Sequence, residues 1–172
     1  MTREEYHFFL DQQLRHHCIL GNDYYVTNEH LVAPDGTTRP SGEIFGYYAI
    51  TRQYYDRYRV PVMHTETSTP FPELNPRWLW KQWTNVLRMR RDGIPVLGFT
   101  WYSMHDQFDW DTQLAERNHH VNECGLFDME RRPRPVAAEY KKLIKEFGKI
   151  TAVAHGELFE VPDRPAAGAY DV

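Results

Sequence analysis

The sequence predicts an α/β fold in which helices cover a parallel sheet. Three segments, residues 18–25, 60–65 and 94–102, have the length and the apolar, β-branched or aromatic content of buried strands. They alternate with segments whose apolar side chains recur at helical spacing. Because strands and helices alternate along the chain, consecutive strands are expected to run parallel and to be connected through helices.

Each predicted helix has its own support in the sequence. Residues 3–17 form the first helix, and a second is expected to run to Tyr58 from Ser41, whose hydroxyl suits an N-cap. Residues 77–92 carry one apolar stripe and are followed by a glycine. Residues 134–147 show the best amphipathic spacing in the chain, which predicts the last helix.

Composition and charge narrow the class of protein. The 172 residues include 20 Lys+Arg and 24 Asp+Glu, and this net charge of −4 gives no reason to expect nucleic acid or a membrane as partner. Cys18 and Cys124 lie far apart in no metal-ligand spacing, so a reduced, cytoplasmic protein without a metal is predicted. We assign residues 1–147 to one domain and residues 148–172 to a C-terminal tail.

Polar and aromatic side chains follow the three predicted strands. The carboxyl ends of parallel strands meet at one edge of a sheet, so these side chains are expected to lie close together. Aromatic rings stack on sugars, and carboxylates bind sugar hydroxyls or attack an anomeric carbon. The strand ends therefore predict a saccharide site. Its candidate residues are Tyr25, Glu66, Trp101, Tyr102, Asp106, Asp109 and Trp110.

Two longer motifs give this pattern a family resemblance. Residues 61–68, P-V-M-H-T-E-T-S, resemble P-I-Y-I-T-E-N-G, the nucleophile strand of family 1 glycoside hydrolases. Residues 98–110, G-F-T-W-Y-S-M-H-D-Q-F-D-W, are similar without a gap to the G-Y-F-A-W-S-L-x-D-N-F-E-W of that family. L-G-N-D-Y-Y at residues 20–25 resembles the G-I-N-Y-Y strand that precedes both motifs. The resemblance covers about residues 15–147.

The resemblance implies a fold and a set of roles. The fold would be the C-terminal portion, about strands 6–8, of a (β/α)8 TIM barrel. The activity would be that of a retaining β-glucosidase-like enzyme that needs no cofactor and acts on a β-linked saccharide. Glu66 would be its nucleophile and Tyr25 a hydrogen-bond donor to that carboxylate. The implied substrate contacts are Trp101 or Tyr102, Asp109 and Trp110.

The sequence departs from the family pattern at several of these positions. The platform Trp of the family aligns with Tyr102, while Trp101 lies one residue earlier. Asp109 replaces a Glu and is one methylene shorter, and Thr67 and Asp23 replace Asn residues. These differences are typical of a divergent subfamily, and they leave the preferred sugar open.

The chain is also expected to be only part of an enzyme. A closed barrel takes about 250 residues, and retaining hydrolysis needs a second carboxylate as acid/base. Asn28-Glu29 imitates the acid/base motif but follows the wrong strand, so Glu29 is interpreted as a loop acid. The missing N-terminal half of the barrel is therefore a predicted partner, and Met1 is not expected to be the start of the functional enzyme.

Two other functional classes stay open from the sequence. The chain could be a non-catalytic carbohydrate-binding module or an inactive barrel fragment that has kept the aromatic site. A doubly wound nucleotide-binding fragment would share the βα order, but no Gly-rich phosphate turn follows any strand. His64-x-Glu66 is similar to a zinc deaminase pattern, yet the Pro-Cys-x-x-Cys partner is absent, so a core histidine is expected.

Overall fold

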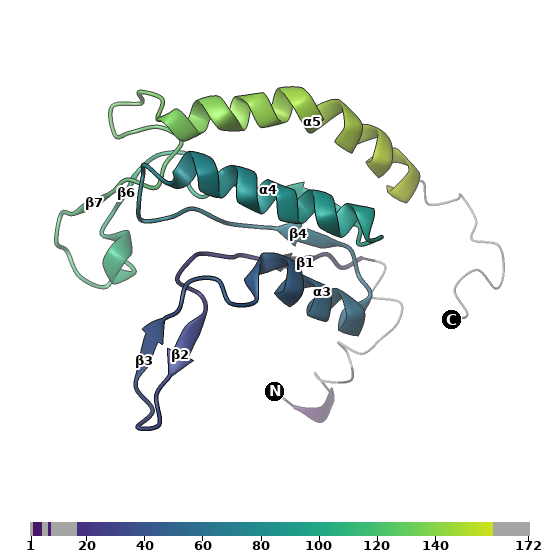
Figure 1. Ribbon diagram of the computed structural model, residues 1–172, viewed down its shortest axis with the longest axis horizontal. Coiled ribbons are helices and arrows are strands. Elements are labelled where there is room, and N and C mark those ends of the chain that lie inside the picture. Colours follow the sequence, from purple (N-terminus) through teal and green to yellow (C-terminus); the bar gives the residue numbers. More distant parts are fainter. Residues whose placement is uncertain (1, 5–6, 8–16, 160–172) are drawn as a thin grey trace.

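The computed structural model describes residues 2–4, 7 and 17–159 (Figure 1). The helix predicted at residues 3–17 lies almost entirely outside the described residues. Within the part of the chain that is described, no helix is both long enough and apolar enough to cross a membrane.

The central sheet has three strands in the order β1-β4-β5. Strand β1 is Leu20–Asn22, β4 is Val62–His64 and β5 is Val96–Phe99, and both neighbouring pairs are parallel. Helix α3, Gly46–Tyr58, connects β1 to β4, and α4, Asn75–Arg91, connects β4 to β5. The predicted α/β fold with a parallel sheet is thus confirmed.

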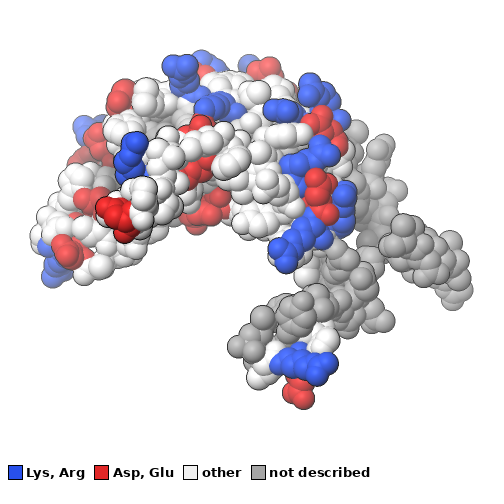
Figure 2. Space-filling view, turned by 60° about the horizontal axis from the view of Figure 1, so that its bottom comes forward, with Lys and Arg blue, Asp and Glu red and all other residues white. Residues whose placement is uncertain are grey.

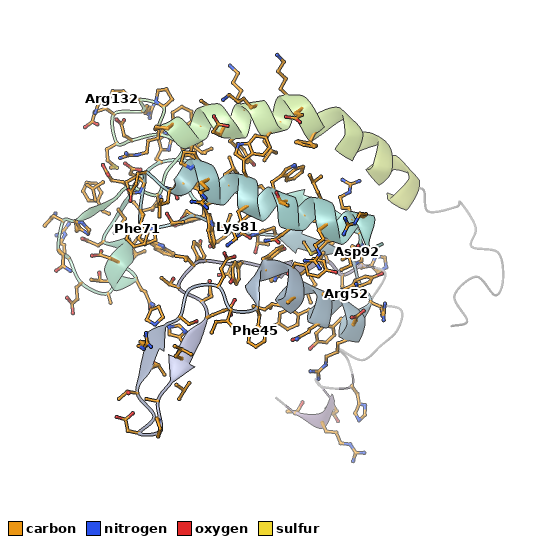
Figure 3. The ribbon with its side chains drawn as sticks, in the orientation of Figure 1. Phe45, Arg52, Phe71, Lys81, Asp92 and Arg132 are labelled. Atoms are coloured by element: carbon orange, nitrogen blue, oxygen red, sulfur yellow. The ribbon has the colours of Figure 1, made fainter. Side chains whose placement is uncertain are left out.

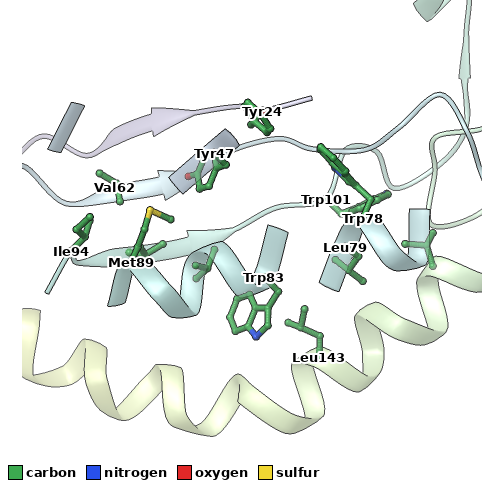
Figure 4. Packing of buried hydrophobic residues seen from close by; sticks show 13 residues of the cluster. Tyr24, Tyr47, Val62, Trp78, Leu79, Trp83, Met89, Ile94, Trp101 and Leu143 are labelled. Carbon is green, nitrogen blue, oxygen red and sulfur yellow. The ribbon is translucent and has the colours of Figure 1, made fainter. Parts of the chain in front are cut away.

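Helix α4 lies between the sheet and helix α5, Pro135–Phe159, so the core has two apolar layers (Figure 4). Trp83 of α4 connects the layers, because its ring packs 5.9 Å from that of Phe99 and 5.3 Å from that of Phe147, between ring centroids. Large side chains at such positions typically contribute about 3–5 kcal/mol relative to alanine. This packing fixes the sheet, and hence the ends of its strands, relative to the helices.

Two helix boundaries differ from the prediction. Helix α3 begins at Gly46, and the Ser41 hydroxyl donates to the carbonyl of Gly42 rather than capping the helix. Phe45, which precedes α3 (Figure 3), makes no side-chain cap either. Helix α5 continues to Phe159 instead of ending at residue 147. The last turns of α3 and α4 carry arginines, and Lys and Arg gather at this end of the molecule, at the right of Figure 2, as the helix dipoles favour.

Two small antiparallel pairs lie in the segments that follow β1 and β5. Strands β2 (His30–Val32) and β3 (Thr38–Pro40) form a hairpin where only a loop was predicted. Strand β6 (Gln107–Phe108) pairs with β7 (Val121–Asn122), and the 3-10 helix η1 (Trp110–Thr112) lies between them in the chain. Both pairs lie at the left of Figure 1, β6 and β7 at the far left and the β2–β3 hairpin below them.

Candidate active site

Glu66 lies just beyond the carboxyl end of β4, beside the end of β1. The register of these strands pairs Asn22 with His64, which brings the next residues of both segments together. The backbone N–H of Tyr24 donates to the Glu66 carbonyl at 3.0 Å. The Tyr25 hydroxyl donates to Glu66 Oε2 at 2.8 Å. Two residues 41 positions apart in sequence thus share a hydrogen bond, at the edge where the sequence predicted a site.

Tyr25 is held in its neutral, donating form. Burial and then the hydrogen bond to Glu66 raise the pKa of its hydroxyl well above the ordinary value of 10. A neutral phenol donates to a carboxylate and favours its ionised form. Tyr25 can therefore orient Glu66 but cannot act as a base near neutral pH.

The two adjacent aromatic residues after β5 have different environments. Trp101 is only 5% exposed, packs in the core (Figure 4) and donates from Nε1 to the Cys124 carbonyl at 3.0 Å. Tyr102 is half-buried, and its ring centroid lies 5.1 Å from that of Trp110. Burial raises the pKa of the Tyr102 hydroxyl, with smaller contributions from Cys124 and the charge of Glu66. Tyr102 and Trp110 are thus the adjacent rings that remain partly accessible to a ligand.

Asp106 and Asp109, the two candidate acids after β5, already have partners within the protein. Asp106 is buried, and its carboxylate accepts from Arg134 Nε, which lies 3.0 and 3.1 Å from its two oxygens, from Arg134 Nη2 and from the Gly125 N–H. Asp109 is also buried and accepts from the backbone N–H of His120 at 2.9 Å. Burial opposes ionisation of Asp109, but backbone N–H groups of the 118–120 loop outweigh it and lower the pKa.

A cleft of about 690 Å³ opens beside Tyr25. Its walls come from the segments after all three strands and include hydroxyl, amide, carboxylate and aromatic side chains, among them Ser68, Trp110, Asn122 and Glu123. Its volume lies within the range typical of small-molecule sites. The cleft offers both stacking and hydrogen-bonding groups, which is what a sugar requires.

Glu29 has a structural environment, as the sequence interpretation expected of a loop acid. Its carboxylate accepts hydrogen bonds from the backbone N–H groups of Ile44, Phe45 and Gly46 and from the Tyr24 hydroxyl. Burial opposes ionisation, but these donors prevail and lower the pKa of Glu29 to about 2. Glu29 therefore caps α3 in place of Ser41 and does not carry a proton near neutral pH.

His64 lies in the core rather than in a metal site. It is fully buried, and its ring stacks on that of Tyr47 with 3.8 Å between the centroids. Burial lowers its pKa to about 3, with only a small opposing contribution from Gln82, so the ring is neutral. Among the described residues no three His, Cys, Asp or Glu side chains come together as metal ligands.

Sequence reasoning missed two residues that contact the Glu66 segment. Thr67 is fully buried, and its hydroxyl accepts a hydrogen bond from Trp78 Nε1 at 2.7 Å. The motif alignment flagged Thr67 only as a replacement of Asn. The apolar stripe of α4 gave no signal for Trp78, because helical spacing does not reveal which indole N–H meets a polar partner.

No family model and no curated protein matches the chain. Solved structures of glycosidases do. The β-glycosidase BGL167 matches at 22% identity over 69% of this chain and 31% of its own, with a TM-score of 0.54. A hyperthermophilic β-glucosidase mutant matches at 19% identity over 78% of this chain and 36% of its own, with a TM-score of 0.56. A β-D-glucuronidase of Dictyoglomus thermophilum matches at 18% identity over 72% of this chain and 22% of its own, with a TM-score of 0.52.

The chain spans between 22% and 36% of the length of these proteins. Identities this low show a shared fold, not a shared chemistry. The chain therefore has the fold of part of a β-glycosidase.

Proposed function

We propose that this chain is the nucleophile-bearing portion of a retaining β-glycosidase of family 1 type, β-glucosidase-like in its activity. The observation that carries the proposal is the position of Glu66 at the carboxyl end of β4, with the Tyr25 hydroxyl 2.8 Å from its Oε2. In an α/β barrel this end of the strands is where active sites lie. The resemblance of residues 61–68 and 98–110 to family motifs supports the same assignment.

The proposed reaction has two steps. A Glu66 oxygen attacks the anomeric carbon, a glycosyl–enzyme bond forms, and the bond to the leaving oxygen breaks as an acid protonates that oxygen. Water, deprotonated by the same acid/base residue, then displaces Glu66 and releases the sugar with retained configuration. Tyr25 keeps the carboxylate oriented between turnovers. No cofactor takes part.

The acid/base belongs to a complementary segment in this proposal. It must lie about 5–5.5 Å from the nucleophile, and Glu29, Asp106 and Asp109 are each bound to other groups of the protein. Within the described part of the chain, strands β1 and β5 each pair on one side only, so this sheet has two open edges that further strands could extend. We propose that the N-terminal half of the barrel occupies them, with this chain supplying strands six to eight.

The proposed substrate is a β-linked saccharide or glycoside that extends from Glu66 into the cleft beside Tyr25, whose lining includes Trp110 but neither Glu66 nor Tyr102. Tyr102 and Trp110 are proposed to stack on the sugar. Asp109 and Trp101 remain predicted contacts, although Asp109 has backbone partners and Trp101 is in the core. A cytoplasmic location, predicted from the cysteine usage, completes the proposal.

A non-catalytic saccharide-binding role is the second candidate. It is favoured by the cleft beside Tyr25, which offers Trp110 and hydrogen-bonding groups while Glu66 is not among its lining residues. Such a module would use the aromatic pair and leave Glu66 without a chemical role.

Release of a fluorescent phenol from an aryl β-glucoside tests the proposal. With the N-terminal half of the barrel supplied, we expect hydrolysis to fall at least about 10³-fold in Glu66→Gln and to be unchanged in Glu73→Gln, an exposed control. Hydrolysis that persists in Glu66→Gln would exclude Glu66 as nucleophile. Saccharide binding without hydrolysis, equal in both variants when followed by tryptophan fluorescence, would favour the binding module.

A further inference from the structure

We propose that Thr67 and Trp78 are positioning residues for the Glu66 carboxylate. The inference rests on the proposed role of Glu66 as nucleophile. It assigns to a buried threonine and a helical tryptophan the task of holding the backbone from which that carboxylate extends.

The Thr67 hydroxyl joins three elements. Its Oγ1 donates to the Tyr24 carbonyl at 2.6 Å and accepts from Trp78 Nε1 at 2.7 Å. Tyr24 follows β1, Thr67 follows β4, and Trp78 lies in the first turn of α4. One fully buried hydroxyl thus uses its donor and an acceptor position to tie the ends of two strands to a helix.

The backbone around Glu66 is held from both sides of β4. The Tyr24 N–H donates to the Glu66 carbonyl at 3.0 Å, and the Tyr102 N–H donates to the Thr67 carbonyl at 3.1 Å. The rings of Tyr24 and Trp78 stack with an interplanar angle of 10° and 6.2 Å between centroids. Tyr24 is therefore itself fixed by the partner that donates to Thr67.

This framework matters because the Glu66 side chain has little other support. From the side chains that the structure describes, its carboxylate receives one hydrogen bond, that of Tyr25. A nucleophile must be held within a fraction of an ångström of its productive position, and small displacements cost large factors in rate. With a single side-chain donor, the direction of the Glu66 carboxylate depends on its own backbone, which Thr67 and Trp78 hold.

Trp83 shows that the Trp78 hydrogen bond is not a general property of this helix. Both indoles are buried in α4. Trp83 Nε1 has no hydrogen-bond partner among the described residues, whereas Trp78 Nε1 is bound to the residue that follows Glu66. The pair therefore provides a matched comparison in which ring volume is lost at both sites but a hydrogen bond at only one.

The test is carboxyl ¹³C NMR of the full chain labelled at glutamate, with the Glu66 signal assigned by its loss in Glu66→Gln. We expect Trp78→Phe and Thr67→Val to move and broaden this signal near neutral pH. Trp83→Phe and Thr67→Ser, which keep the Thr67 hydroxyl bonded, should leave it unchanged. Where hydrolysis is measurable, kcat should fall about 10-fold in Thr67→Val with KM within about twofold, and Thr67→Ser should restore it.

An unchanged Glu66 signal in Thr67→Val, or equal changes in Trp78→Phe and Trp83→Phe, would overturn the inference. Because the signal does not require turnover, this result is independent of the hydrolysis assay. A chain whose Glu66→Gln variant keeps its activity would lose the proposed function, while the NMR comparison would still report whether Thr67 holds the carboxylate.

Discussion

Two consecutive tyrosines donate to two different glutamates, and the two carboxylates differ in how many hydrogen bonds they accept. Tyr24 donates to Glu29 and Tyr25 donates to Glu66. Glu29 also accepts three backbone N–H groups at the start of α3. The Glu66 carboxylate, half-buried at the end of β4, accepts a hydrogen bond from one side-chain hydroxyl of the described residues.

The difference separates a structural carboxylate from one that is free to react. Four fixed donors lower the pKa of Glu29 to about 2, against the desolvation that burial imposes. Such a group has no proton to donate near neutral pH, and it cannot attack a carbon without giving up the hydrogen bonds that cap α3. The Glu66 carboxylate retains acceptor capacity. The same residue type, bonded by the next tyrosine in the chain, therefore suits covalent chemistry.

Asp106 resembles Glu29 in that its carboxylate is already bound by other groups of the protein. Its carboxylate side chain is 1% exposed and is bound by Arg134, whose side chain is 19% exposed. The hydrogen bond to Asp106 raises the pKa of Arg134, so the guanidinium is charged at every ordinary pH. It connects the segment after β5 to the residue just before α5, which stabilises the loop that carries Trp110.

The largest effect is expected from breaking that pair. Arg134→Met should lower the free energy of unfolding by about 3–5 kcal/mol, because it leaves the Asp106 charge buried without its partner. Arg132→Met is the matched control, since Arg132 is 72% exposed on the outer loop before α5 (Figure 3) and should change stability by less than about 0.5 kcal/mol. Urea unfolding measures both. Equal losses would show that Asp106 is not a structural acid.

Removing the charge of Glu29 should have a smaller effect, and one that depends on pH. Glu29→Gln should lower the free energy of unfolding by about 1–2 kcal/mol at pH 7. The folded-state pKa of Glu29 is depressed from 4.5 to about 2, so its contribution is present above pH 4.5 and is lost as the pH falls toward 2. The difference from the wild-type chain should therefore shrink across this window in urea unfolding. Glu73→Gln should show no such change, and a difference that is constant with pH would contradict the assignment.

The smallest effects should come from the two tyrosines, and they should be of different kinds. Tyr24→Phe removes one hydrogen bond to the cap and should cost about 1 kcal/mol in unfolding free energy without moving the Glu66 carboxyl ¹³C signal. Tyr25→Phe should move that signal and lower hydrolysis about 10- to 100-fold, with stability changed by less than about 0.5 kcal/mol. If both variants gave the same pattern, the contrast between the two glutamates would not hold.

The sequence by itself determined the features that depend on local periodicity. Alternating strands and amphipathic helices predicted the parallel sheet, and the strand-end motifs pointed to Glu66 and Tyr25, which the structure brings to 2.8 Å. Such patterns are readable because they repeat over short distances along the chain.

Only the tertiary structure decided which partner each polar group has. The start of α3 was misplaced because its cap comes from Glu29, 15 residues or more before the N–H groups that it binds. The packing of the elements, not sequence spacing, put Trp101 in the core, left Tyr102 beside Trp110 and joined Thr67 to Trp78. Hydrogen-bond partners distant in sequence depend on how whole elements pack, and no local period encodes that packing.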